Sequence, residues 1–266
     1  MGSFKDLAKL RGLAEAGLVV KTASQQAQAQ RDDELRKRRE AEEAAARAVL
    51  ANAPRYPWAR AATLAEARAL LTEHEMVFSI AGRGEVEAII DLEALVAPPQ
   101  ISDGDVVVDE LLLPGDGSAL YVRGDLTVGK RIVQRFRAGL LLVFGSLRAR
   151  HVITTGQILV TGDLDVTGTL YGNSTSYATI VLGAARIGTL IGAKQHMFSL
   201  LGAVSIGELV DPDGDAPNFS IFARTTPRSS RTIDPAVGDA HDEAAIAAAL
   251  ATRDDVLTPG VAGASQ

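Results

Sequence analysis

Asp125, Asp163 and Asp165 are the side chains whose type and spacing come closest to a chemical site. Carboxylates that cluster with Arg or Lys on one face can hold calcium or remove a proton. Asp125 and Asp163 occupy the same position of a repeated motif, but the copy between them carries Ser146 there. Because Asp and Ser are ordinary turn residues after a glycine, we interpret this set as structural.

The histidines suggest a second chemical hypothesis, a zinc centre. They are His74, His151, His196 and His241. His151 follows Gly145 by six residues, whereas His196 precedes Gly202 by six, so the two occupy different positions of the motif. A catalytic zinc needs three protein ligands, and the chain contains no cysteine. We therefore predict no metal site, no catalytic residue and no cofactor.

A local basic cluster occurs on a chain whose net charge is −6. Its members are Lys130, Arg131, Arg135, Phe136 and Arg137 in one loop, with Arg148 and Arg150 in the next repeat. Such a patch could dock an acidic protein surface, an anionic lipid or a phosphate. A solvated corner of the fold is the alternative interpretation. The acidic balance of the whole chain argues against nucleic acid as a partner.

The elements that position these residues come from a motif repeated around a glycine. Its five copies are "LYVRGDLTV", "LLVFGSLRA", "ILVTGDLDV", "TIVLGAARI" and "FSLLGAVSI". Their glycines are Gly124, Gly145, Gly162, Gly183 and Gly202, at intervals of 21, 17, 21 and 19 residues. Apolar residues alternate on both sides of the glycine, and a second apolar pair follows each copy. An earlier coil is expected at 105–113, with its glycine missing.

Short alternating segments at this period predict a stacked β architecture. One unit alone cannot bury its apolar face, but coils stacked about 4.8 Å apart share hydrogen bonds and align their apolar columns. The glycine marks the corner of the coil. A β-sandwich does not require one register on a glycine, and a propeller blade is about twice as long. We predict a mainly β fold, a single-stranded β-solenoid (β-helix) of about five to six coils.

The composition divides the chain into four regions. Residues 1–53 are expected to form a helical, charged and partly flexible arm, and residues 54–100 a small α/β cap segment. Residues 101–210 form the predicted solenoid. Residues 211–266 are expected to be a polar tail with a short helix.

Two smaller signals concern the regions before the solenoid. Thr63 and Glu66 have the spacing of a capping box at the start of a short amphipathic helix. Phe4, Leu7 and Leu10 lie at helical spacing, so the N-terminal helix could contact a membrane surface peripherally. No run approaches about 18 uninterrupted apolar residues, and no signal-peptide core is present, so we expect a cytoplasmic protein.

The glycine-centred coils resemble those of bactofilins and related polymer-forming bacterial β-solenoid proteins. The resemblance covers residues 105–210 and rests on the five copies of the motif. It implies a cytoskeletal scaffold whose solenoids associate end to end into filaments without nucleotide. Two features depart from the family: about 100 residues precede the core, and corner loops such as "GKRIVQRFRAG" at 129–139 vary.

The ends of an open β-stack expose strand edges, which proteins cap or use for association. The first 100 residues are placed to cap one end, and the apolar last coil is followed by polar chain. We therefore predict a homo-oligomer or filament that self-associates through the last coil. The predicted interface residues are Phe198, Leu200, Leu201, Val204 and Ile206.

Two other classes of function remain open. One is a protein that binds a single partner, such as an immunity protein that neutralises a bacterial toxin. The other is an enzyme built on the solenoid, which would need polar residues gathered on one flank. The sequence shows no such gathering, so we rank the enzyme last.

Overall fold

The structure, a computed structural model, describes Lys37 and residues 56–73, 99–115, 117–135, 139–175, 177–214 and 228–259. The chain divides into two compact units, Met1–Ala48 and Val49–Gln266, and the solenoid belongs to the second. The predicted arm, apart from Lys37, lies outside the described residues. The proposed membrane-contact residues Phe4, Leu7 and Leu10 lie outside them as well.

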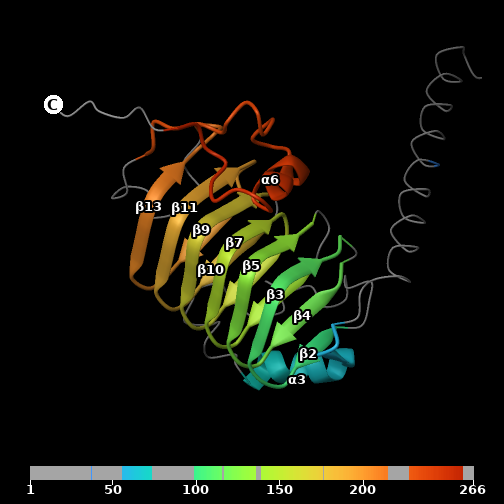
Figure 1. The fold of residues 1–266 in the computed structure, drawn as a ribbon. Helices are drawn as coiled ribbons and strands as arrows, with labels where there is room; N and C mark the ends of the chain where they lie inside the picture. Colours follow the sequence, from blue (N-terminus) through green and yellow to red (C-terminus); the bar gives the residue numbers. More distant parts are fainter. Residues whose placement is uncertain are drawn as a thin grey trace, which may run out of the picture. The chain divides into compact units, whose positions relative to one another are not determined.

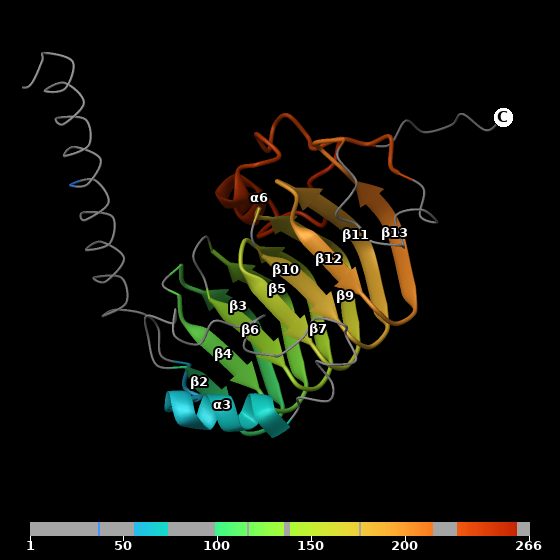
Figure 2. The same ribbon diagram turned by 180° about the vertical axis from the view of Figure 1, so that it is seen from behind.

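Two β-sheets face each other across an apolar core (Figure 1). Sheet A has the strand order β1-β2-β4-β6-β8-β10-β12, and all its neighbours pair in parallel except β1 and β2. Its strands are β1 (Arg60–Ala61), β2 (Gln100–Ser102), β4 (Ala119–Val122), β6 (Leu140–Val143), β8 (Gln157–Val160), β10 (Ala178–Val181) and β12 (Met197–Leu200). Figure 2 shows this sheet from the other side.

Sheet B contains the longer strands and is parallel throughout, in the order β13-β11-β9-β7-β5-β3. Its strands are β3 (Val106–Leu113), β5 (Leu126–Gln134), β7 (Leu147–Thr154), β9 (Leu164–Asn173), β11 (Ala185–Ala193) and β13 (Val204–Val210). Consecutive strands alternate between the sheets from β2 onward, so each coil is a strand of sheet A, a corner and a strand of sheet B. The six pairs from β2–β3 to β12–β13 confirm the predicted mainly β solenoid.

The first coil carries a glycine that the sequence alignment missed. Ser102 of β2 pairs with Val122 of β4, so Gly104 takes the position that Gly124 has in the next coil. The prediction that this coil lacks its glycine is wrong. It failed because "QIS", the stretch that forms β2, has a single apolar residue and does not show the alternation of the other copies.

The apolar columns of the motif fill the space between the sheets. Leu120, Leu141 and Ile158 are paired in neighbouring strands and are buried. Thr179 continues this column as a polar member, and its hydroxyl lies 3.0 Å from Nε2 of buried His196. Burial of one Leu, Ile or Val side chain stabilises a fold by about 1.5–3 kcal/mol, so these columns are the main source of stability.

Helix α3 (Leu64–Glu73) begins at the predicted capping box. The Glu66 N–H donates to Oγ1 of Thr63 at 3.1 Å, and the Thr63 N–H donates to the Glu66 carboxylate at 2.8 Å. The buried face of the helix, with Ala67 and Leu70, belongs to one apolar cluster with Tyr121 on the outward face of sheet A. The capping box therefore fixes where a covering helix starts.

The N-terminal end of the solenoid is partly closed. Strand β1 pairs antiparallel with β2 and so covers the first edge of sheet A. Tyr56, Trp58 and Ala59 pack against the central core. The Tyr56 hydroxyl donates to the carbonyl of Leu112 on β3 at 2.7 Å, so this segment also contacts sheet B.

The C-terminal segment 228–259 covers part of the outward face of sheet B. Its helix α6 (Glu243–Ala249) is capped by Asp242, whose side chain accepts the N–H of Ala245. The cover includes the buried residues Ile246, Leu250, Val256 and Leu257. They pack with the outward column Val133, Ile153, Tyr171, Ile191 and Val210. Composition predicted a polar tail with a short helix. The structure contains a short helix, and it also shows that apolar residues of this segment pack on sheet B.

Candidate functional site

The corner glycines stack directly on one another along the solenoid. A Cβ on Gly145 would lie 2.7 Å from the backbone of Gly124, and a Cβ on Gly162 would lie 2.7 Å from that of Gly145. A Cβ on Gly183 or Gly202 would lie closer still, at 2.4 and 2.3 Å from the carbonyl oxygen of the glycine before it. Neighbouring coils can approach to hydrogen-bonding distance at this corner because no side chain stands between them.

The residue after each corner glycine ties its coil to the next one. Oδ1 of Asp105 accepts the N–H of Asp125 at 2.8 Å, and Oδ1 of Asp125 accepts that of Ser146 at 2.8 Å. The Ser146 hydroxyl then accepts the N–H of Asp163 at 3.2 Å, and Oδ1 of Asp163 that of Ala184 at 2.8 Å. The bond from Ser146 is the main cause that lowers the pKa of the Asp125 carboxyl. We call this chain the corner ladder.

The three candidate carboxylates are not brought into one site. Asp125 and Asp163 belong to the corner ladder two coils apart, and Asp165 lies on β9, 4.0 Å from Arg186 of β11. Among the described residues, no group of three or more His, Cys, Asp or Glu side chains could hold a metal ion. The repeated Gly-Asp pair thus has a structural explanation in the stacking of the coils.

The basic cluster of the sequence is divided among ion pairs. These pairs are Lys130–Asp109, Arg131–Glu110, Arg148–Asp125 and Arg150–Asp254. Arg135 is exposed, and Phe136 and Arg137 lie outside the described residues. Three of the four acids come from the preceding coil, and the fourth comes from the C-terminal cover. Because these partners are about 20 or more residues away from the basic residues, the sequence of the loop alone suggested an unpaired basic patch.

The two solenoid histidines are buried at separate places. Nδ1 of His151 accepts the N–H of Thr169 at 3.1 Å, and the ring of His196 packs against Phe198 with centroids 4.9 Å apart. Burial is the main cause that lowers the pKa of His151 to about 4, with help from Arg150 and Arg131. Burial also lowers the pKa of His196 to about 3. Both rings are therefore neutral at pH 7.

The predicted interface residues separate into two groups. Phe198 and Leu200 are 0% and 8% exposed and belong to the central core, so their placement on a docking surface is corrected. Leu201 is 49% exposed, and Val204 and Ile206 are partly buried against the core. Phe198 and Leu200 are alternate residues of β12 and point inward, whereas Leu201 follows the end of this strand and Val204 and Ile206 belong to β13.

Strands β12 and β13 are the last strands of sheets A and B in the part of the chain that the structure describes. Residues 195–207, which span β12 and the first half of β13, contain no Asp, Glu, Lys, Arg or Pro. The second half of β13 is bridged at Leu209 by Arg228, and the Ser229 N–H donates to the Leu209 carbonyl at 2.7 Å. The uncharged stretch 195–207 is the candidate interface, which we call the C-terminal edge.

The fold establishes the class of this protein, a β-solenoid. No protein-family model matches the chain, and no curated protein or solved structure matches it either. Within the described segments, no helix has the length and apolar character needed to cross a membrane. A function has to be inferred from the surfaces of the solenoid itself.

Proposed function

We propose that this protein is a non-enzymatic scaffold, similar in kind to bactofilins, that acts by self-association through the C-terminal edge. The absence of charge and proline from residues 195–207 carries the proposal. In monomeric proteins, exposed edge strands usually carry charges, proline or bulges that discourage pairing with a strand of another molecule. At this edge the chain instead presents Leu201, which is 49% exposed.

A second copy of the chain is the occupant that fits the C-terminal edge best. Val204 and Ile206 continue the apolar columns of β11, and a further coil of the same sequence would extend these columns. A two-fold axis at the edge would pair β13 with β13 of the second copy in antiparallel orientation. Ser205 is exposed on this strand and neutral, so the pairing brings no like charges together.

The test replaces Leu201 by Glu in the full chain. We expect the wild type to be a dimer or larger species by size-exclusion chromatography with light scattering, and Leu201→Glu to be a folded monomer with the circular dichroism spectrum of the wild type. Leu112→Glu is the matched control, because Leu112 is 45% exposed in the first coil at the other end of the solenoid. This control should leave the dimer intact.

Three results would count against the proposal. They are a wild type that stays monomeric at high concentration, a Leu112→Glu variant as monomeric as Leu201→Glu, and a Leu201→Glu variant that still associates. A stoichiometric complex with one other protein, without self-association, would support the partner-binding alternative instead.

A further inference from the structure

The two ends of the solenoid differ in charge and in what covers them. At the C-terminal edge, residues 195–207 contain no charged residue and no proline. At the N-terminal end, segment 56–61 contains Pro57 and Arg60 and contacts the first strands of both sheets. This difference decides how many copies can join when the chain self-associates.

The first edge of sheet A is occupied by β1, which pairs antiparallel with β2. The N–H of Ala62 donates to the carbonyl of Pro99 at 2.8 Å and extends this pairing. Strand β1 is only two residues long, and its Arg60 forms ion pairs of 3.0 Å with Glu66 and Asp103. A short strand that carries a charge is a protected edge, so β1 discourages the addition of a further strand to sheet A.

The apolar core at the N-terminal end is closed by aromatic side chains. The ring centroids of Tyr56 and Trp58 lie 5.1 Å apart, and both residues pack against the core between the sheets. The Tyr56 hydroxyl donates to the carbonyl of Leu112, so this acceptor on β3 is already bonded. The last coil of another copy would therefore meet aromatic rings here instead of open apolar columns.

The charges of the two ends also oppose a head-to-tail contact. Leu111 of β3 and Leu209 of β13 belong to the same buried column of sheet B. Glu110 and Glu208 each come one residue earlier, so they occupy equivalent positions in the first and last coils. If the last coil of one copy stacked on the first coil of the next, these two carboxylates would face each other. Arg131, the partner of Glu110, lies on β5, on the opposite side of β3 from the incoming strand.

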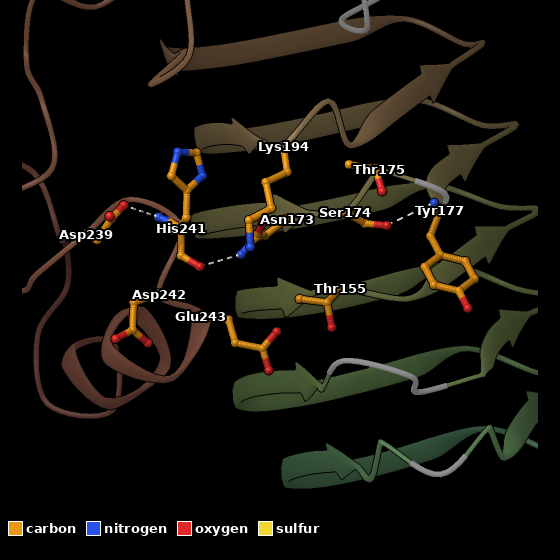
Figure 3. A pocket seen from close by; sticks show the side chains of 10 residues that line it. All are labelled: Thr155, Asn173, Ser174, Thr175, Tyr177, Lys194, Asp239, His241, Asp242 and Glu243. Atoms are coloured by element: carbon orange, nitrogen blue, oxygen red, sulfur yellow. Dashed lines mark hydrogen bonds between the residues drawn. The ribbon is translucent and has the colours of Figure 1, made fainter. Parts of the chain in front are cut away.

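Segment 228–259 keeps the outward apolar column of sheet B occupied by the chain itself. Figure 3 shows Asn173, at the end of β9, directed at His241 of this cover, and its Nδ2 donates to the His241 carbonyl at 2.9 Å. The Tyr171 hydroxyl donates to the carbonyl of Ala240 at 2.7 Å. Because polar contacts and apolar packing both hold the cover, a second copy is directed to the C-terminal edge rather than to this face.

We infer that self-association through the C-terminal edge closes at two copies and does not continue as a filament, an inference that rests on the proposed function. A two-fold contact between identical edges uses both of them, because it pairs β13 with β13. Each copy of the dimer then presents only its N-terminal end. There, segment 56–61 and the carboxylate of Glu110 oppose the addition of a further copy.

The test uses introduced cysteines, because the chain contains none of its own. Ser205 on β13 and Val107 on β3 are exposed and occupy equivalent positions of the last and first coils. A two-fold contact brings Ser205 near Ser205 of the second copy, whereas head-to-tail stacking brings it near Val107. The full-length variants Ser205→Cys, Val107→Cys and the double variant are treated with a short bismaleimide crosslinker and separated by denaturing electrophoresis.

We expect Ser205→Cys to form a covalent dimer and Val107→Cys to stay a single chain. The double variant should give the dimer and no larger species, because its first coil has no neighbour. Addition of Leu201→Glu to Ser205→Cys is the control, and it should abolish the crosslink by breaking the contact at the C-terminal edge. Without crosslinker, the mass of the wild type from light scattering should reach a plateau at two chains.

The outcomes separate the end of growth from the existence of the contact. A ladder of trimers and larger species from the double variant would overturn the inference and leave self-association intact, because it would show head-to-tail stacking. A crosslink between Ser205→Cys and Val107→Cys chains in a mixture would overturn it in the same way. No crosslink in any variant would overturn the proposed function, and the closed dimer with it.

Discussion

Gly104 and Gly145 occupy the same corner of the coil and differ in what lies next to them. A Cβ at Gly145 would lie 2.7 Å from the backbone of Gly124, whereas a Cβ at Gly104 would meet nothing within 4 Å. We expect Gly145→Ala to lower the free energy of unfolding by about 3 kcal/mol or more, because backbone has to move. Gly104→Ala should stay within about 0.5 kcal/mol of the wild type. Urea denaturation followed by circular dichroism measures both, and equal losses would contradict the stacking argument.

The buried histidines make stability depend on pH. Their pKa values in the fold are about 4 for His151 and about 3 for His196, below the ordinary 6.5 that the unfolded chain shows. Below pH 6.5 the two histidines become protonated in the unfolded chain but stay neutral in the folded one. The free energy of unfolding is therefore highest above that pH and falls toward pH 4. Denaturation at pH 7, 6 and 5 measures this slope. His151→Gln should reduce the slope, and an unchanged slope would contradict the assignment.

At the scale of elements, the C-terminal cover depends on the buried side chain of Ile246 in α6. Ile246→Asp would bury a charge without a partner against sheet B, so we expect segment 228–259 to detach while the strands persist. Hydrogen exchange should increase in this segment, and binding of a hydrophobic dye should rise as the outward apolar column becomes exposed. Ala244→Asp is the control, because Ala244 is exposed on the same helix. Unchanged exchange in Ile246→Asp would show that the cover is held by other contacts.

The elements that the sequence predicted are those with local signals. Alternating apolar residues and the corner glycines define the strands, and Thr63 with Glu66 defines the start of α3. The C-terminal cover has no such signal. Ile246 packs on a column of residues on the outward face of sheet B, and in the sequence each of these residues appears only as the second residue of an apolar pair. Contacts between the solenoid and this cover are further from prediction, since the Asn173 side chain donates to the carbonyl of His241, 68 residues later in the chain.

At the scale of the whole molecule, pairing across a two-fold axis can be tested by exchange of charge. Ser205 is exposed in the half of β13 that belongs to the C-terminal edge, and a two-fold axis would bring the two copies of this residue near each other. We expect Ser205→Lys alone and Ser205→Glu alone to associate weakly, because like charges would meet. A mixture of the two variants should form heterodimers, and added salt should weaken this preference. Light scattering of the mixture measures the effect, and two variants that associate as well alone as together would argue against an antiparallel β13 pair.

The corner ladder also has a direction. Asp105, Asp125 and Asp163 each accept a hydrogen bond from backbone that is synthesised about one coil later. Each of these acids offers its acceptor only to the following coil, so the side-chain bonds of the ladder all run from one coil to its C-terminal neighbour. Ala184 has no side-chain acceptor for the N–H of Ala203, so the last coil is joined at this position by the backbone bond from Ala185 to Ala203 and receives no side-chain bond of the ladder.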